Sequence, residues 1–393
     1  MALQAHWTPF DSRNPMVPTA GIADVDQQPA WLRLPFVPGQ VSSDGACLVE
    51  SLRVLNPFAV VTAVQCADQR RRPTAVVVMP MSGHFGALLY DLVQQLSRDV
   101  DVWVVDWTNA RHVPEIVGTF GFADVLRTIA DALTMAGPGA HLVAICQSTV
   151  PAAAIATALV ESDDPAKPAS LALIGGPIDH RARPTRLSST LELTPLSWYE
   201  RHAIVSVSEG APGAGRLVYP AETHQRSLLT YLTRHLWLGD DLAQKVFADD
   251  GSEPQRLPFL TLYTQVKDIS ARVFLESISV IYHRQSLLTD GLTWQGRPIL
   301  PRRVTSLPLI TVEAPDDDIA APGQTLAAHH VFSALDDRLR KHVVLSTGGH
   351  FSLFHGTICR AEVVPALSAF WADTAPETPN RPCEHDRLRS FPR

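Results

Sequence analysis

Hydrophobic residues in the first half of the chain fall into short runs that are rich in valine, isoleucine and leucine. Uninterrupted apolar runs of this kind are typical of strands buried on both faces of a parallel sheet. They occupy residues 74–80, 102–107, 141–145 and 170–174. Stretches with helical apolar spacing separate them and predict helices at 87–97, at 122–135 and from 150 onward. This alternation predicts an α/β fold with a mostly parallel sheet.

The pattern changes beyond residue 180, where amphipathic helical segments replace the alternation. Helices are predicted at 227–238, 240–248 and 259–282, because apolar residues recur there at helical spacing. A strand pattern returns only at 306–312. We therefore expect residues 181–300 to form a mainly helical cap inserted into the α/β core.

The last strand is predicted at 342–345, and a closing helix follows at 357–372. Residues 48–67 mix apolar and polar positions without a clear period and predict no element. Both ends of the chain are rich in proline and weakly patterned, which favours irregular structure. The expected order is an irregular arm at 1–45, core at 46–180, cap at 181–300, core at 301–373 and a disordered tail at 374–393.

Composition narrows the class of protein. The 393 residues are 46% hydrophobic and 19% charged, with a net charge of −7, so no basic field suggests a nucleic-acid partner. Five widely spaced cysteines without a C-x-x-C pair indicate neither a disulfide framework nor a zinc site. We expect no metal or organic cofactor. The beginning of the chain lacks the features of a signal peptide, and no apolar run could span a bilayer, so a cytoplasmic protein is expected.

The run at 141–145 ends at Cys146, and a helical stretch of small residues begins shortly after. A strand, a tight turn and a helix of small residues are typical of a nucleophile elbow, whose usual sequence is G-x-S-x-G. Here the turn reads Ala-Ile-Cys-Gln-Ser over 144–148, with a thiol in place of the serine hydroxyl. The N-terminus of the following helix favours the thiolate, so Cys146 is predicted as the nucleophile. The alternative is an inert cysteine buried at the end of a strand.

A base and an acid follow the nucleophile in the order expected for α/β-hydrolases. Gly348 and Gly349 precede His350 after the last strand, and this position predicts His350 as the base. Three adjacent aspartates, 316–318, follow the strand at 306–312. We predict Asp317 as the acid because the following Asp318-Ile319 matches a pattern common at this position, and Asp316 is the alternative.

An acyl transfer also needs hydrogen-bond donors for the oxyanion. The backbone N–H of Gln147 is the first predicted donor, and that of Ser82 or Gly83, in the loop after the strand at 74–80, is the second. His84 in the same loop could serve as a second base, but is predicted to shape the pocket. The other predicted substrate-binding residues are Phe85, Trp107, Trp198 and Tyr199, and Tyr231, Trp237 and Phe274 are further candidates for an apolar groove. Each of these aromatic residues could instead belong to the core.

Several blocks of sequence resemble the intracellular polyhydroxybutyrate depolymerases, over residues 75–372. They are Pro-Met-Ser-Gly-His-Phe at 80–85, Asp-Trp-Thr-Asn-Ala-Arg-His-Val-Pro at 106–114, Cys-Gln at 146–147, Gly-Gly-Pro-Ile-Asp at 175–179, Gly-Gln-Thr at 323–325 and Gly-His at 349–350. That family is related to the polyester synthases and has a cysteine nucleophile in an α/β-hydrolase fold. The resemblance implies a triad of Cys146, Asp317 and His350. Ser148 stands where the family usually has proline, and Pro315-Asp316 replaces its usual Glu-Asn or similar pair.

The expected activity is hydrolysis of amorphous short-chain polyhydroxyalkanoate and its oligomers through an acyl-thioester. The partners would be the polymer and the surface of storage granules. The alternative is acyl transfer on the same triad, either thiolysis by CoA or polymer synthesis, although synthases more often have G-x-C-x-G at the elbow. A non-catalytic granule-surface protein is a third possibility, against which the complete triad argues. The sequence leaves the oligomeric state open, a homodimer included.

Overall fold

The computed structural model describes residues 48–66, 72–81, 89–227, 230 and 266–374. The predicted arm and nearly all of the predicted tail lie outside these residues. So do the helix at 240–248, most of the helix at 227–238, and Tyr231 and Trp237. The division of the chain into core and cap at the predicted boundaries stays a prediction.

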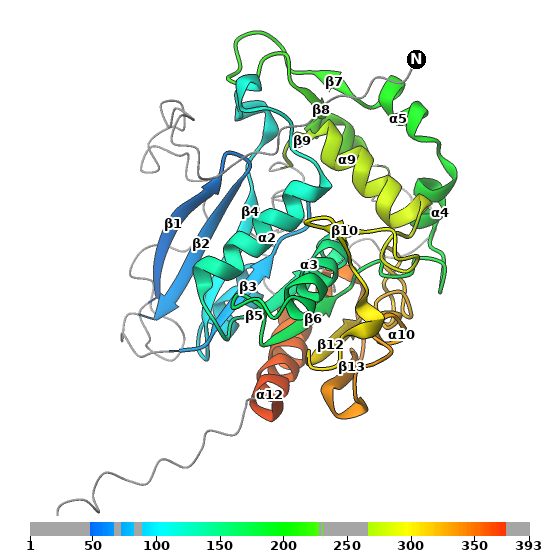
Figure 1. The fold of residues 1–393 in the computed structure, drawn as a ribbon. Helices are drawn as coiled ribbons and strands as arrows, with labels where there is room; N and C mark the ends of the chain where they lie inside the picture. The colour runs from blue at the N-terminus through cyan, green and yellow to red at the C-terminus, as the bar shows by residue number, and fades with distance from the viewer. Residues whose placement is uncertain (1–47, 67–71, 82–88, 228–229, 231–265, 375–393) are drawn as a thin grey trace, which may run out of the picture.

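A twisted sheet runs through the core (Figure 1). Its eight strands lie in the order β1-β2-β4-β3-β5-β6-β12-β13 among the described residues. The strand β2 is antiparallel to both of its neighbours, and all the other pairs are parallel. This order is that of an α/β-hydrolase, so the predicted fold class is confirmed. The strands are β1 (Leu48–Asn56), β2 (Ala59–Cys66), β3 (Thr74–Val78), β4 (Asp101–Trp107), β5 (His141–Ile145), β6 (Ser170–Ile174), β12 (Leu309–Glu313) and β13 (Arg340–Val344).

The core helices predicted from the sequence are present, and α10 is a further short helix that was not predicted. They are α1 (Tyr90–Leu96), α2 (Phe122–Ala136), α3 (Thr149–Glu161), α10 (Ala328–Val331), α11 (Gly356–Ile358) and α12 (Val364–Thr374). A π-helical turn, Cys359–Val363, joins α11 to α12, so the closing helix is continuous. Helix α3 is apolar on every side and buried from Thr149 to Leu159, as expected for a helix that packs against both the sheet and the neighbouring helix α2.

The hairpin of β1 and β2 has no counterpart among the predicted elements. Residues 59–64 of β2 are all buried, so the strand lacks the alternation that a half-exposed strand would show. The turn between the strands is closed by Asn56, whose Oδ1 accepts a hydrogen bond of 2.8 Å from the N–H of Phe58. An asparagine followed by a proline was the available signal for this turn.

The described part of the predicted cap contains helices and short strands. The helices are α4 (Arg186–Leu193), α5 (Leu196–His202), α9 (Ala271–Ser277) and a π-helix (Ile278–His283). A small antiparallel sheet consists of β7 (Val205–Ser206), β8 (Leu217–Tyr219) and β9 (Ile269–Ser270), and a hairpin consists of β10 (Thr293–Trp294) and β11 (Arg297–Pro298). Strands of two or three residues are too short to produce a hydrophobic period.

The helix predicted at 259–282 is wrong at its N-terminal side. Residues 259–265 lie outside the described chain, residues 266–270 are not helical, and the helix begins at Ala271. Two buried charges determine this start. Lys267 donates to both carboxylate oxygens of Asp106 at 3.0 Å, and Asp268 accepts a hydrogen bond of 2.9 Å from Arg111. These ties hold 266–270 extended along the core, whereas the apolar spacing alone favoured a longer helix.

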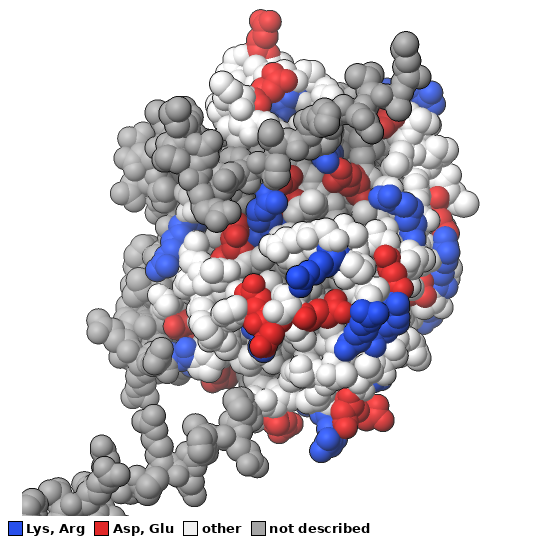
Figure 2. Space-filling view, viewed as in Figure 1, with Lys and Arg blue, Asp and Glu red and all other residues white. Residues whose placement is uncertain are grey.

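A second set of hydrogen bonds joins the predicted cap to the loop between β4 and α2. The guanidinium of Arg216 is 5% exposed and donates to the carbonyls of Val113, Pro114 and Gly118. Ser270 adds a hydrogen bond of 2.8 Å to the carbonyl of Phe120. The loop between β4 and α2 is therefore bonded to Arg216, just before β8, and to Ser270 of β9. On the face shown in Figure 2, acidic and basic side chains are interspersed over the described surface.

Candidate active site

The turn after β5 has the geometry of a nucleophile elbow. Cys146 has φ = +56°, a left-handed conformation that is strained for a residue with a Cβ atom. A single 3-10 turn, Cys146–Ser148, leads directly into α3. The thiol is partly exposed, whereas Cys359 is fully buried and its pKa is raised by that burial. The turn thus presents Cys146 at the carboxyl edge of the sheet.

The buried side chain of Ser148 stabilises this turn through hydrogen bonds. Its buried Oγ accepts a hydrogen bond of 2.9 Å from the N–H of Ile145. The same hydroxyl lies 2.9 Å from the carbonyl of Val78, at the end of β3, and 2.7 Å from that of Ile145, and its single hydrogen can be donated to either. A serine at this position therefore links the elbow to the neighbouring strand.

Two glycines after β6 leave room for the elbow and for His350. A Cβ atom on Gly175 would lie 2.5 Å from Leu353 Cδ1 and 3.4 Å from His350 Cε1. A Cβ atom on Gly176 would lie 1.9 Å from the Oγ1 of Thr149, in the first turn of α3. Close packing around the site thus requires the two glycines of the Gly-Gly-Pro-Ile-Asp block.

Asp317 and His350 meet across the ends of β12 and β13. The Nδ1 of His350 lies 2.7 Å from Oδ2 of Asp317, and the other carboxylate oxygen accepts hydrogen bonds of 2.8 Å from the N–H groups of Ile319 and Ala320. Asp317 is 4% exposed, while Asp316 is exposed. The structure therefore pairs His350 with Asp317 and leaves Asp316 facing solvent.

The surroundings of His350 favour its protonated form. Burial by itself would lower the pKa of His350, but the charges of Asp317 and Cys146 and the hydrogen bonds to both raise this pKa well above its ordinary value. Because Nδ1 faces Asp317, Nε2 is the nitrogen left for Cys146.

Only the first of the predicted oxyanion donors, Gln147, lies among the described residues. Gln147 follows Cys146 at the start of the turn, which is the position required of the first donor. Ser82, Gly83, His84 and Phe85 lie outside the described residues. The identity of the second donor and the roles of His84 and Phe85 in substrate binding stay predictions.

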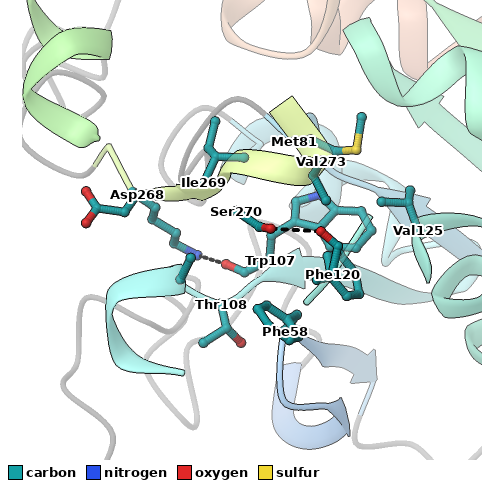
Figure 3. A pocket seen from close by; sticks show the side chains of 12 residues that line it. Phe58, Met81, Trp107, Thr108, Phe120, Val125, Asp268, Ile269, Ser270 and Val273 are labelled. Carbon is teal, nitrogen blue, oxygen red and sulfur yellow. Dashed lines mark hydrogen bonds between the residues drawn. The ribbon is translucent and has the colours of Figure 1, made fainter. Parts of the chain in front are cut away.

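Trp107 lines a small cavity of about 30 Å³ at the carboxyl end of β4 (Figure 3). Its Nε1 donates a hydrogen bond of 2.8 Å to the carbonyl of Met79, and apolar side chains form most of the wall. Cys146, Asp317 and His350 do not line this cavity. Since β3 alone separates β4 from β5, the end of β4 lies about 10 Å from the elbow at the usual strand spacing.

The other described aromatic candidates make ring contacts within the predicted cap. Trp198 is 47% exposed on α5, where its ring contacts Tyr199 and His202. Tyr199 is buried in the core of the cap, with its ring 5.6 Å from that of Phe274. Their role in substrate binding stays a prediction, and the structure offers a packing role for Tyr199 and Phe274.

Tyr282 is a residue of the site that the sequence analysis did not single out. It lies on the π-helix Ile278–His283 and is 4% exposed. Burial raises the pKa of Tyr282, and the nearby Cys146 adds to this effect, whereas the side chain of Gln147 lowers it. In the sequence, Tyr282 is one apolar position in a helical pattern, which gives no sign of a polar role.

Other kinds of site receive no support from the described residues. No three or more His, Cys, Asp and Glu side chains among them gather in a way that could hold a metal ion. None of the helices in the described part of the chain has the length and apolarity needed to cross a membrane.

The sheet order, the strained turn after β5, and the acid and histidine after β12 and β13 define an α/β-hydrolase. Residues 175–375, just over half of the chain, match the family described as "PHB de-polymerase C-terminus". The chain therefore belongs to the polyhydroxybutyrate depolymerase family and is a carboxylic ester hydrolase. The resemblance seen in the sequence is confirmed by this match.

Several solved structures are similar to this chain at low sequence identity. An enol-lactonase from Burkholderia xenovorans shares 13% identity, with 82% of this chain and 100% of that chain covered and a TM-score of 0.47. A bromoperoxidase from Bacillus anthracis shares 13% identity, with 82% of this chain and 99% of that chain covered and a TM-score of 0.47. A comparison with curated proteins gives no match.

Proposed function

We propose that the protein is an intracellular depolymerase that hydrolyses the ester bonds of amorphous short-chain polyhydroxyalkanoate and its oligomers. The observation that carries this proposal is the 2.7 Å contact between His350 and Asp317, with Cys146 presented beside them on a strained turn. Family membership supplies the class of substrate. We place the enzyme in the cytoplasm, at or near storage granules.

The proposed reaction has two half-reactions. His350 accepts the thiol proton, and the sulfur of Cys146 attacks the ester carbonyl to form a tetrahedral oxyanion, which the N–H of Gln147 stabilises. Collapse breaks the C–O bond, His350 protonates the released hydroxyl end, and the acyl group remains on sulfur. Water then gives a proton to His350 and attacks the thioester, and the proton returns as the acid leaves and the thiol is restored. Asp317 holds the imidazole in the required orientation throughout.

We assign Trp107 to the substrate-binding surface because it ends β4, two strands away from the elbow in the sheet. The adjoining cavity of about 30 Å³ has room for little more than a water molecule, so the polymer itself would lie outside it.

The test compares amorphous granules of polyhydroxybutyrate with the crystalline polymer, and both with soluble oligomers, by release of 3-hydroxybutyrate. We expect release from granules and oligomers, and little from crystalline polymer. Equal rates on both physical forms would contradict the proposed role. Cys146→Ala is the control, since it should release nothing while retaining the fold.

Adding CoA to the same assay separates hydrolysis from thiolysis. Hydrolysis gives the free acid at a rate that does not depend on CoA. Thiolysis gives an acyl-CoA and requires CoA as the acceptor of the acyl group. Accumulation of acyl-CoA would replace the proposed hydrolase by a transferase on the same triad. No product under any condition would favour the non-catalytic granule protein.

A further inference from the structure

The Gly-Gln-Thr block at 323–325 lies where two loops of the candidate active site meet. The loop that carries Asp317 leaves the end of β12 and returns beside it at this block. There the buried hydroxyl of Thr325 accepts a hydrogen bond of 2.8 Å from the N–H of Gly176 and donates one of 3.0 Å to the carbonyl of the same residue. These two bonds join the Asp317 loop to the turn after β6, just beyond the last paired residues of β6 and β12.

A buried carboxylate fixes the position of Thr325. Glu313, the last residue of β12, is 1% exposed and accepts hydrogen bonds of 2.7 to 2.9 Å from the N–H groups of Gly323, Thr325 and Leu326. Hydrogen bonds from backbone N–H groups to an ionised carboxylate are among the stronger ones in proteins. They close the two ends of the loop around Asp317 on each other, and so keep Thr325 beside the turn after β6.

The turn after β6 packs against both of the other residues of the predicted triad. The backbone of Gly175 lies against the imidazole, since a Cβ atom at this position would be 3.4 Å from Cε1 of His350. Gly176 lies against Thr149, whose hydroxyl donates a hydrogen bond of 2.7 Å to the carbonyl of Cys146. A shift of this turn would therefore disturb the base and the nucleophile elbow together.

We infer that Thr325 is a positioning residue for catalysis: its hydroxyl holds the glycine turn after β6, and with it the imidazole of His350, in the place that the triad requires. This inference rests on the proposed function, in which Cys146, Asp317 and His350 react as a triad. Two consecutive glycines allow many backbone conformations, so the turn needs a restraint from a neighbouring element. A displacement of about 1 Å at a catalytic group can lower the rate by about 100-fold.

The test is Thr325→Val, which keeps the shape of the side chain and removes the hydroxyl. With p-nitrophenyl butyrate as the substrate, we expect kcat to fall about 10- to 100-fold with KM nearly unchanged. Thr325→Ser keeps the hydroxyl and should retain kcat within about threefold of the wild type. An unchanged kcat in the valine variant, or an equal loss in the serine variant, would overturn the inference. Failure of the wild type on polyester alone would contradict the proposed function and not the role of Thr325, because the small ester needs no recognition of a polymer.

Thr128→Val is the matched control. Thr128 is also buried, and its hydroxyl likewise accepts one hydrogen bond, of 2.9 Å from the side chain of Asn56, and donates one, of 2.8 Å to the carbonyl of Asp124. Both valine variants should have a lower Tm, whereas the kcat of Thr128→Val, measured well below its Tm, should stay within about twofold of the wild type. An equal loss of kcat in both variants would mean that kcat follows stability alone, and would overturn the positioning role.

Alkylation of Cys146 by iodoacetamide shows whether Thr325 acts through His350, and it needs no ester substrate. The thiolate is the form that reacts, and His350 accepts the thiol proton in the proposed mechanism. Thr325→Val should therefore slow alkylation at neutral pH by about threefold or more when His350 is present, and should have no further effect in His350→Ala. Equal slowing in both backgrounds would overturn the inference. If Thr325→Val does not fold, Thr325→Ala removes the same hydroxyl with a smaller side chain, and the same results are expected of it.

Discussion

At the scale of single residues, the proposed activity depends on the transfer of a proton from Cys146 to His350. The raised pKa of His350 depends in part on Cys146, so the base is matched to a thiol. Cys146→Ala should abolish turnover, and Cys146→Ser should keep about 0.1% of it or less, since His350 must then deprotonate a hydroxyl, which is a much weaker acid than a thiol. Steady-state hydrolysis of p-nitrophenyl butyrate measures this. Full activity in the alanine variant would remove Cys146 from the mechanism.

The three adjacent aspartates form a natural comparison. Asp317→Asn should reduce kcat by up to about 10⁴-fold, because an amide at this position stabilises the wrong tautomer of His350. Asp316→Asn changes an exposed side chain and should alter kcat by less than about threefold. The same kinetic assay applied to both variants checks the assignment, and a larger loss in Asp316→Asn would reverse it.

The sequence predicted the residues that meet in the site better than those that support them. Chain order and position after strands brought Cys146, Asp317 and His350 to one edge of the sheet, because parallel strands end together. No such rule applies to Tyr282 or Lys267, whose partners depend on how the cap packs on the core. Only the fold reveals the groups that these two side chains reach.

At the scale of elements, buried strands were predicted well, and elements defined by tertiary contacts were not. β3 to β6 have continuous apolar sequences that identify them, and β12 and β13 begin two or three residues away from the predicted bounds. The hairpin of β1 and β2 lacks a period, and β9 replaces the first part of a predicted helix because Lys267 and Asp268 are drawn to the core. Strand propensity accounts for β3 to β6, β12 and β13. Tertiary packing accounts for the hairpin of β1 and β2 and for β9.

The turn between β5 and α3 leads to a prediction about Ser148. Ser148→Ala removes the acceptor of the Ile145 N–H and should lower the free energy of unfolding by about 1–3 kcal/mol. It should also lower kcat, since the elbow loses its link to β3. Chemical denaturation and steady-state kinetics measure the two effects.

Ser162→Ala is the control for this joint. Ser162 ends the same helix and donates a hydrogen bond of 2.8 Å to the carbonyl of Ala158, far from the elbow. It should cost about 1 kcal/mol or less and leave kcat unchanged. If Ser148→Ala behaves in the same way, Ser148 has no particular role in the elbow.

At the scale of the whole molecule, a buried ion pair joins cap and core. Lys267→Met would leave the carboxylate of Asp106 buried without its cation, and should lower the free energy of unfolding by about 3–5 kcal/mol. The double variant Lys267→Met/Asp106→Asn should recover part of this loss, because no charge is then left unpaired. Thermal and chemical unfolding measure both variants. An equal or greater loss in the double variant would contradict this account of the pair.

The loop between β4 and α2 has a consequence for how the molecule comes apart. Arg216 occupies three of its carbonyl groups, and Arg111 and Ser270 add further bonds between loop and cap. Opening the described cap region at this junction would expose all of these groups at once. We therefore expect no stable, partly unfolded intermediate. Differential scanning calorimetry should accordingly record one endotherm, with a calorimetric enthalpy equal to the van't Hoff enthalpy. Amide deuteration of β8 and β9 should keep pace with that of β4, as it does for segments that share a single cooperative unit.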